Sequence, residues 1–342
     1  MIDSLLILFF LNGLVSLFPF EDFKRFNKLQ STIYLLLFLT FLYIAAFREP
    51  GVDRDYDAYR YWFEKLRDNV EYSFMYISEI IKKFGGTSIY LFITYAIIGV
   101  STKFLVIKKV SVAPMLSLVV YLGYLYPLQD LTQIRAGAAA GIILLAIYFL
   151  MNGKKWYAIF FVALAIFFHY SSFVIIPLLF LSRKKFNRLF FVLAILISYG
   201  GAVYLKTFLE IIIDYLPPII KWKILAYDAE NNLELNIFNG WQLLRIGMAF
   251  LFIWNVDKLF KYDDRLVYLL KVFIIGICSF PLLSFNPVFA VRVSDLYFVS
   301  ELLLLPSLIL LFPAKPIMKM IVIVYAFAFL YLNLYYIGIF SK

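Results

Sequence analysis

The sequence contains very little cysteine and histidine. Of its 342 residues, one is a cysteine, Cys278, and one is a histidine, His169. A single cysteine excludes an intramolecular disulfide and a cysteine-based metal cluster, and one isolated histidine gives no zinc-binding motif. No glycine-rich phosphate loop of the GxxxxGK[ST] type is present, so nothing supports a nucleotide-driven pump. We therefore expect neither a metal nor another cofactor.

Charged residues are also scarce. Only 16% of the residues are charged and 64% are hydrophobic, whereas soluble domains have about 25% charged residues. Apolar runs long enough to cross a bilayer core of about 30 Å recur along the chain. The first, residues 2–18, lacks a basic leader and a small-residue cleavage site, so we expect a retained span. The composition predicts an all-α polytopic membrane protein, with residues 1–342 as one integral membrane domain.

The net charge of +10 comes mainly from short loops between the predicted spans. Basic residues mark the cytoplasmic side of membrane proteins, so this excess records topology and does not predict a nucleic-acid partner. The basic residues that we assign to cytoplasmic loops include Lys24, Lys103, Lys154, Arg183, Lys258 and Lys319.

Placing these loops in the cytoplasm predicts about 11 or 12 transmembrane helices. One region needs special treatment, because a single span over residues 156–181 would put Arg183 and the later basic loops outside. A hairpin of two short halves that turns near His169 keeps them inside. We therefore predict a hairpin there.

The predicted outer loops, approximately residues 48–86 and 206–240, differ from the short basic inner loops. Residues 48–86 carry charges of both signs, and within them Tyr72–Phe84 has apolar residues at helical spacing. This pattern predicts an amphipathic helix that lies along the membrane interface. Because varied loops are where sites are built, we expect the functional site to face outward.

Polar residues gather at several places on the predicted outer side. They lie in the loop after the second span, in the turn before a small-residue helix at residues 136–141, in the middle of the hairpin, one turn into a late span, and in the segment between two later spans. Charged groups next to hydrocarbon are costly unless they line a wet cavity or bind a charged ligand. These candidate residues are Arg48, Asp53, Asp55, Tyr59, Gln133, Arg135, His169, Arg245 and Arg292.

The arginines predict an anionic substrate. Several guanidinium groups at one membrane face repel each other without a shared anion, and guanidinium binds phosphate through paired hydrogen bonds. A pyrophosphate on a lipid is the membrane-borne anion that needs several of them, so we assign pyrophosphate binding to Arg48, Arg135, Arg292 and Arg245. The alternative is local pairing: Arg48 with Asp53, Arg135 with Asp130, and Arg292 with Asp295.

Three residues are candidate catalytic bases. A histidine side chain can act as a general base, which makes His169 a candidate; alternatively, it is a hydrogen-bonded turn residue that holds the hairpin. Asp53 and Asp55 are also candidates, but carboxylates beside arginines have lowered pKa values and are weak bases. Their spacing would also suit a divalent ion, although Arg54 between them disfavours a compact metal site.

Several motifs in this order resemble those of a known family. The segment from Phe47 to Tyr59, with Arg48, Gly51 and Asp53, resembles the opening motif of the bacterial polysaccharide polymerases of the Wzy/EpsG type. The remaining motifs are similar to the family's later ones: the turn Gln133-Ile134-Arg135, the run Phe168-His169-Tyr170-Ser171, and Arg292 five residues before Tyr297.

This resemblance implies a GT-C-like glycosyltransferase that needs no metal or nucleotide sugar. Such an enzyme joins oligosaccharide repeat units carried on undecaprenyl pyrophosphate, at the outer face of the bacterial plasma (inner) membrane, into O-antigen, capsule or exopolysaccharide. Tyr59 and Gln133 would position the substrate. The implied partners are the lipid-linked glycan donor and acceptor and membrane lipids, with a flippase and a chain-length regulator as candidates.

Other functions remain open from the sequence. An O-antigen ligase or another lipid-linked sugar transferase would use the same chemistry, although the loop at 206–240 carries no histidine. A polysaccharide or lipid transporter would predict an internal repeat, and none is evident. A structural scaffold would leave the outer arginines unexplained.

Overall fold

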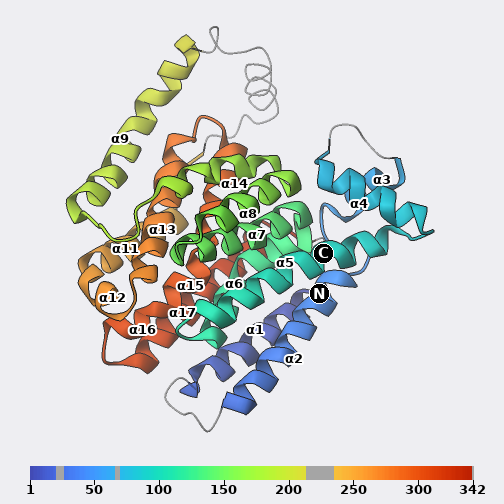
Figure 1. Ribbon diagram of the computed structural model, residues 1–342, viewed down its shortest axis with the longest axis horizontal. Coiled ribbons are helices and arrows are strands. Elements are labelled where there is room, and N and C mark those ends of the chain that lie inside the picture. The colour runs from blue at the N-terminus through green and yellow to red at the C-terminus, as the bar shows by residue number, and fades with distance from the viewer. Residues whose placement is uncertain (21–26, 66–69, 213–234, 341–342) are drawn as a thin grey trace. The chain divides into compact units, whose positions relative to one another are not determined.

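The regular structure of this protein is helical. The computed structural model describes residues 1–20, 27–65, 70–212 and 235–340 (Figure 1). Six helices are long and apolar enough to span a membrane, and six shorter apolar helices of 10–17 residues accompany them in the described part of the chain. This confirms the predicted all-α polytopic membrane protein. The long helices are Lys28–Ala46, Ser88–Val110, Ile134–Met151, Asp264–Leu282, Pro287–Leu311 and Lys315–Tyr336.

The chain divides into two compact units. The first contains residues Met1–Leu179 and Glu301–Lys342, and the second contains Phe180–Ser300. The helices of the first unit are α1 (Ile2–Leu17), α2 (Asn27–Ala46), α3 (Tyr56–Lys65), α4 (Tyr72–Lys83), α5 (Ser88–Val110), α6 (Pro114–Gly123), the π-helix η3 (Tyr126–Thr132), α7 (Ile134–Met151), α8 (Lys155–Phe168), α15 (Glu301–Leu304), η6 (Leu305–Ser307), α16 (Leu308–Leu311), α17 (Lys315–Tyr331) and η7 (Leu332–Tyr336). The 3₁₀ helix η4 (Tyr170–Phe180) leads into the second unit, whose helices are α9 (Arg188–Ile212), α11 (Gly240–Trp254), α12 (Val256–Tyr262), α13 (Asp264–Leu282) and α14 (Pro287–Phe298).

Glycines allow α5 and α7 to pack closely in the first unit. A Cβ atom added at Gly99 would lie 2.3 Å from Asp130 Oδ1, and one at Gly141 would lie 2.0 Å from Thr102 Oγ1. Small residues at such positions let helix backbones approach each other where lipid supplies no hydrophobic driving force. Helix α7 packs against α5 and α8, and its small-residue start is the one expected from the sequence.

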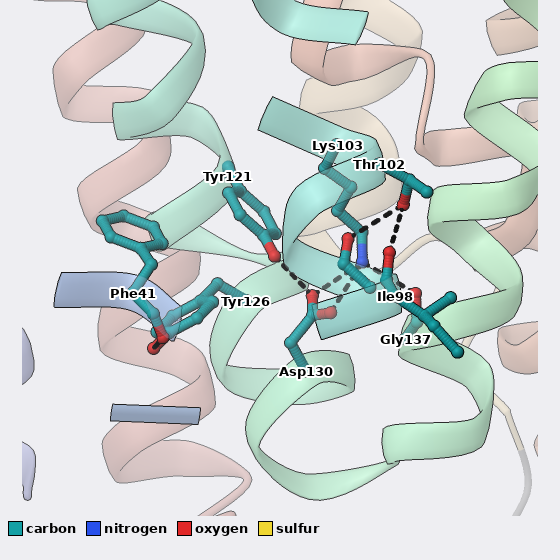
Figure 2. A network of polar contacts seen from close by, with 9 residues as sticks. Phe41, Ile98, Thr102, Lys103, Tyr121, Tyr126, Asp130 and Gly137 are labelled. Atoms are coloured by element: carbon teal, nitrogen blue, oxygen red, sulfur yellow. Dashed lines mark hydrogen bonds and ion pairs between the residues drawn. The ribbon is translucent and has the colours of Figure 1, made fainter. Parts of the chain in front are cut away.

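Lys103 is a helix-core residue, and its assignment to a cytoplasmic loop was wrong. Helix α5 continues to Val110, so Lys103 lies inside it with a fully buried side chain. Its Nζ donates hydrogen bonds of 2.8 Å to both carboxylate oxygens of Asp130 and to the carbonyl of Gly137 (Figure 2). Tyr121 donates a further 2.8 Å bond to Asp130 Oδ2. The network therefore joins α5, α6, η3 and α7.

One predicted feature of the loops matches the structure, one is untested, and one differs. Helix α4 coincides with the predicted amphipathic helix. Helix α8 ends before His169, which has extended backbone angles (φ −154°, ψ 112°) and lies between α8 and η4. The predicted turn back across the membrane stays a prediction. Helix α9, expected to end at Leu205, continues to Ile212. Residues 213–234 of the predicted second outer loop lie outside the described residues.

Candidate functional site

Glu71 is the centre of a polar cluster built from three helix ends. It precedes the first residue of α4, Arg135 lies in the first turn of α7, and His169 follows the last residue of α8. Glu71 Oε2 accepts a hydrogen bond from Arg135 Nη1, and Glu71 Oε1 lies 3.0 Å from His169 Nδ1. The side chains of Glu71, Arg135 and His169 are 7%, 19% and 13% exposed. The cluster is nearly buried, and a small part of Arg135 and His169 reaches the surface.

Local backbone structure presents Arg135 and His169 at helix ends. Gln133 leaves helical geometry (φ −88°, ψ 64°) between η3 and α7, and its carbonyl accepts the Gly137 N–H at 2.9 Å. The extended backbone of His169 ends α8. The two side chains that contact Glu71 therefore come from the start of one helix and the end of another.

Aromatic rings enclose the guanidinium of Arg135. Its central carbon lies 5.5 Å from the ring centroid of Tyr59, 5.0 Å from that of Trp62 and 6.0 Å from that of Phe74. Such contacts favour a cation, more strongly where water is excluded. Helix α3 supplies Tyr59 and Trp62, so the predicted positioning residue Tyr59 is part of this site, whereas Gln133 is half-buried at the start of α7.

The carboxyl of Glu71 is held in its charged form. Burial raises its pKa, but the hydrogen bond from His169 and the positive charge of Arg135 together outweigh burial, so the pKa of Glu71 lies below its ordinary value. An ionised carboxylate only accepts hydrogen bonds, so Nδ1 of His169 must carry the proton in this contact. In neutral His169, Nε2 is then the proton acceptor.

Arg48 and Asp53 form a second, deeper cluster. Arg48 Nε donates to Asp53 Oδ2 at 2.7 Å, and the two side chains are 1% and 0% exposed. Arg48 Nη1 donates to the carbonyl of Ala45 at 2.8 Å, and its guanidinium carbon lies 4.3 Å from the ring centroid of Phe92. The backbone N–H of Asp55 donates to Asp53 Oδ1 at 3.0 Å. The structure thus shows the local pairing of Arg48 with Asp53.

The loop that carries this pair is tied to the C-terminal part of the first unit. Gly51 has φ +73°, a conformation that glycine adopts without steric cost, and it turns the chain between Arg48 and Asp53. Asp53 forms an isolated antiparallel bridge with Phe340, and Arg54 Nη2 donates to the carbonyl of Ile337 at 2.5 Å. The predicted motif is therefore a fixed loop.

Arg245 and Arg292 belong to the second unit. Arg245 lies on α11 with 5% of its surface exposed, and its guanidinium carbon is 3.6 Å from the ring centroid of Phe298. Arg292 is exposed on α14 and forms no ion pair with another described residue, so it is not paired with Asp295. Their predicted roles in pyrophosphate binding remain predictions.

The structure brings together residues that are far apart in the sequence. Tyr59 lies beside Arg135, and Arg135 and His169 both contact Glu71. Arg135 is thus paired with Glu71 and not with Asp130, which pairs with Lys103. The sequence analysis missed Glu71 and Trp62. The available signal for Glu71 was its position as an acid directly before an amphipathic helix, and no motif distinguished it from the other acids of the loop.

Comparisons with known proteins identify the family of this chain. The sequence model of the EpsG family matches residues 31–341. The amylovoran biosynthesis protein AmsC of Erwinia amylovora is 27% identical over 243 residues, covering 69% of this chain and 64% of that protein. The chain thus spans a little less than two thirds of that relative, and no solved structure gave a match. Because the family match covers most of the sequence, this multi-pass membrane chain belongs to the EpsG family.

Proposed function

We propose that this protein is a polysaccharide polymerase. It joins oligosaccharide repeat units carried on undecaprenyl pyrophosphate, at the outer face of the bacterial plasma membrane. The EpsG family and the similarity to an amylovoran biosynthesis protein support polysaccharide synthesis. The observation that carries the proposal is the cluster of Glu71, Arg135 and His169, which offers a proton acceptor and a cation side by side.

In the proposed reaction, a hydroxyl of the acceptor sugar attacks the anomeric carbon of the donor sugar. A new carbon–oxygen bond forms while the bond from the anomeric carbon to the pyrophosphate oxygen breaks, and the leaving polyprenyl pyrophosphate keeps the electron pair. The hydroxyl proton passes to Nε2 of His169. Glu71 holds the ring through Nδ1 and stabilises the imidazolium that forms, as a carboxylate beside a histidine does in other acid–base sites.

Arg135 is the proposed ligand of the leaving pyrophosphate in the first unit. Its side chain is 19% exposed, and a fixed guanidinium beside the reacting bond stabilises negative charge that develops on the leaving group. Arg48 and Asp53 pair with each other, and this pair is suited to hold the loop that carries both residues. Asp55 remains an alternative base, and Arg245 and Arg292 remain proposed pyrophosphate ligands of the second unit.

The alternative within the same chemistry is an O-antigen ligase or another lipid-linked sugar transferase. Membership in the EpsG family favours a polymerase over a ligase. A flippase that delivers the substrate and a chain-length regulator are the proposed protein partners, and O-antigen, capsule or exopolysaccharide is the proposed product.

Replacing His169 tests this function. With purified protein and lipid-linked repeat units, we expect His169→Gln to lower the polymerisation rate at least about 100-fold, because general base catalysis contributes on the order of 10²–10⁴. Binding of the donor should change less than about twofold, since the pyrophosphate is held by arginine. The exposed neighbour Tyr170 provides the control Tyr170→Phe, which should keep full activity. Nearly normal rates in His169→Gln would show that the ring only supports the turn.

A further inference from the structure

A groove opens beside α3 that the proposed reaction does not use. It has a volume of about 460 Å³, within the range of small-molecule sites, and is bordered by α3, α4 and the linker before α5. Its lining consists of Tyr56, Arg60, Phe63 and Glu64 from α3, Lys82 from α4, the linker residues Gly86 and Thr87, and Ser88 at the start of α5. All of these belong to the first unit.

The groove combines aromatic and charged surfaces. Tyr56 and Phe63 are 6% and 5% exposed, so their rings are set firmly into the first unit. Arg60 and Glu64 project from the next turns, with side chains 54% and 58% exposed and a 3.4 Å contact between Arg60 Nε and Glu64 Oε1. An exposed pair of this kind contributes little to stability, so both side chains can turn toward a ligand at small cost.

Lys82 closes one side of the groove. Its Nζ donates to the backbone carbonyl of Glu64 at 2.9 Å and lies 5.3 Å from the ring centroid of Phe63. Lys82 thereby joins α4 to α3 while retaining further N–H donors. Two cations and one carboxylate leave the lining with one excess positive charge, which disfavours binding of a metal ion.

This lining matches the chemistry of an oligosaccharide. A sugar ring has an apolar face that can lie against an aromatic ring, and hydroxyl groups around its edge that need both donors and acceptors. Arg60 and Lys82 supply donors and Glu64 supplies an acceptor, while the mostly buried rings of Tyr56 and Phe63 form an apolar floor between them. Pockets that bind small ligands have this combination of apolar walls and a few placed polar groups.

Helix α3 contributes side chains to both the groove and the proposed reaction site. Tyr56, Arg60, Phe63 and Glu64 repeat at three- and four-residue spacing and therefore share one side of the helix. Tyr59 and Trp62 lie near Arg135. The groove and the reaction site are linked through the ring of Phe92. Tyr56 stacks on Phe92 with ring centroids 4.6 Å apart, and the ring centroid of Tyr59 lies 6.5 Å from that of Phe92.

We propose that the groove binds a segment of the glycan several sugars away from the bond being formed. This inference rests on the proposed function, because that function supplies a glycan at the outer loop. A repeat unit or growing chain extends beyond the reacting sugars, and a second contact in the groove beside α3 holds it during successive additions. The groove then sets acceptor affinity and product length, while the cluster at Glu71 performs the reaction.

The test measures glycan binding and product length in the full-length protein. Soluble oligosaccharide fragments of the cell's own polymer, free of lipid and pyrophosphate, serve as the probe. We expect Arg60→Ala and Lys82→Gln each to weaken fragment binding at least about fivefold, raise KM for the acceptor and shorten the product, with kcat within about twofold. The control is Lys83→Gln, which removes the same charge from an exposed neighbouring position outside the groove and should behave as the wild type.

Each contrary result has a separate meaning. Equal effects of Lys82→Gln and Lys83→Gln would overturn the proposed glycan binding by the groove, because general surface charge would explain both effects. The same holds if Lys82→Gln weakens binding to vesicles of anionic phospholipid and leaves fragment binding unchanged, since the groove would then be a lipid headgroup site. If the wild type polymerises lipid-linked units but does not bind fragments, the proposed glycan binding by the groove is overturned and the proposed polymerase function stands. If fragments bind in the groove but no lipid-linked unit is polymerised, the proposed function fails.

Discussion

At the scale of single residues, Glu71 determines the chemistry available to its neighbours. It is the shared acceptor of a guanidinium and an imidazole, so its charge fixes the position of Arg135 and the proton position on His169. Its position directly before α4 is a local signal, but no motif distinguishes Glu71 from the other acids of residues 48–86. Glu71 is 64 positions from Arg135 and 98 positions from His169 in the sequence. Contacts over such separations are determined by packing, which a single sequence does not display.

Glu71→Gln should show how this charge contributes to stability. Folding lowers the pKa of Glu71, so its stabilising contribution is complete above the ordinary value of 4.5 and is lost as the pH falls through the lower folded value. We expect the variant to be less stable by about 2–3 kcal/mol at neutral pH, as for a mostly buried pair that loses one charge. The difference between the two proteins should close in acid.

Thermal unfolding in detergent between neutral and acidic pH provides this measurement. Glu79 lies on the same helix with its side chain exposed, so Glu79→Gln is the matched control and should unfold like the wild type at every pH. A gap between Glu71→Gln and the wild type that is constant with pH would mean that charge is not the cause.

At the scale of helices, the sequence predicts elements better than it predicts partners. The apolar spacing of Tyr72–Phe84 locates α4 because one side of an interfacial helix must be apolar, and Tyr72, Tyr76, Ile80 and Phe84 are indeed exposed along one side. Lys103 was misplaced because a lysine near a predicted span end looks the same whether the helix stops or continues. The burial of Lys103 becomes clear only from its buried partner Asp130 on η3.

The buried pair of Lys103 and Asp130 should behave as a unit. We expect Lys103→Met or Asp130→Leu alone to cost about 3–5 kcal/mol, since each leaves a buried charge without its partner. The double variant should cost clearly less than the sum of the two, because both charges are then removed.

Unfolding of the three variants in detergent gives the coupling energy. Lys108→Met, on the exposed side of the same helix, is the control for loss of one lysine and should be nearly neutral. Additive losses in the double variant would show that Lys103 and Asp130 contribute independently.

At the scale of the whole molecule, the proposed function requires a particular orientation in the membrane. The basic-loop pattern predicts that α3 lies outside the cell and that the turn between α7 and α8 lies in the cytoplasm. In a Cys278→Ala background, we expect Asp57→Cys, at an exposed position of α3, to react with an impermeant maleimide in intact cells. Lys154→Cys, in the exposed turn before α8, should react only after lysis. The reverse pattern would invert the topology and place the proposed site in the cytoplasm.

The bridge between Asp53 and Phe340 also has a consequence for biogenesis. The loop with Arg48 and Asp53 emerges early from the ribosome, whereas its partners Ile337 and Phe340 are synthesised near the other end of the sequence. At about 5–20 residues per second, this loop waits on the order of 15–60 s for the segment that completes it. The first outer loop therefore matures late, and a fusion placed directly after Phe340 is expected to slow its maturation even though it is distant in sequence.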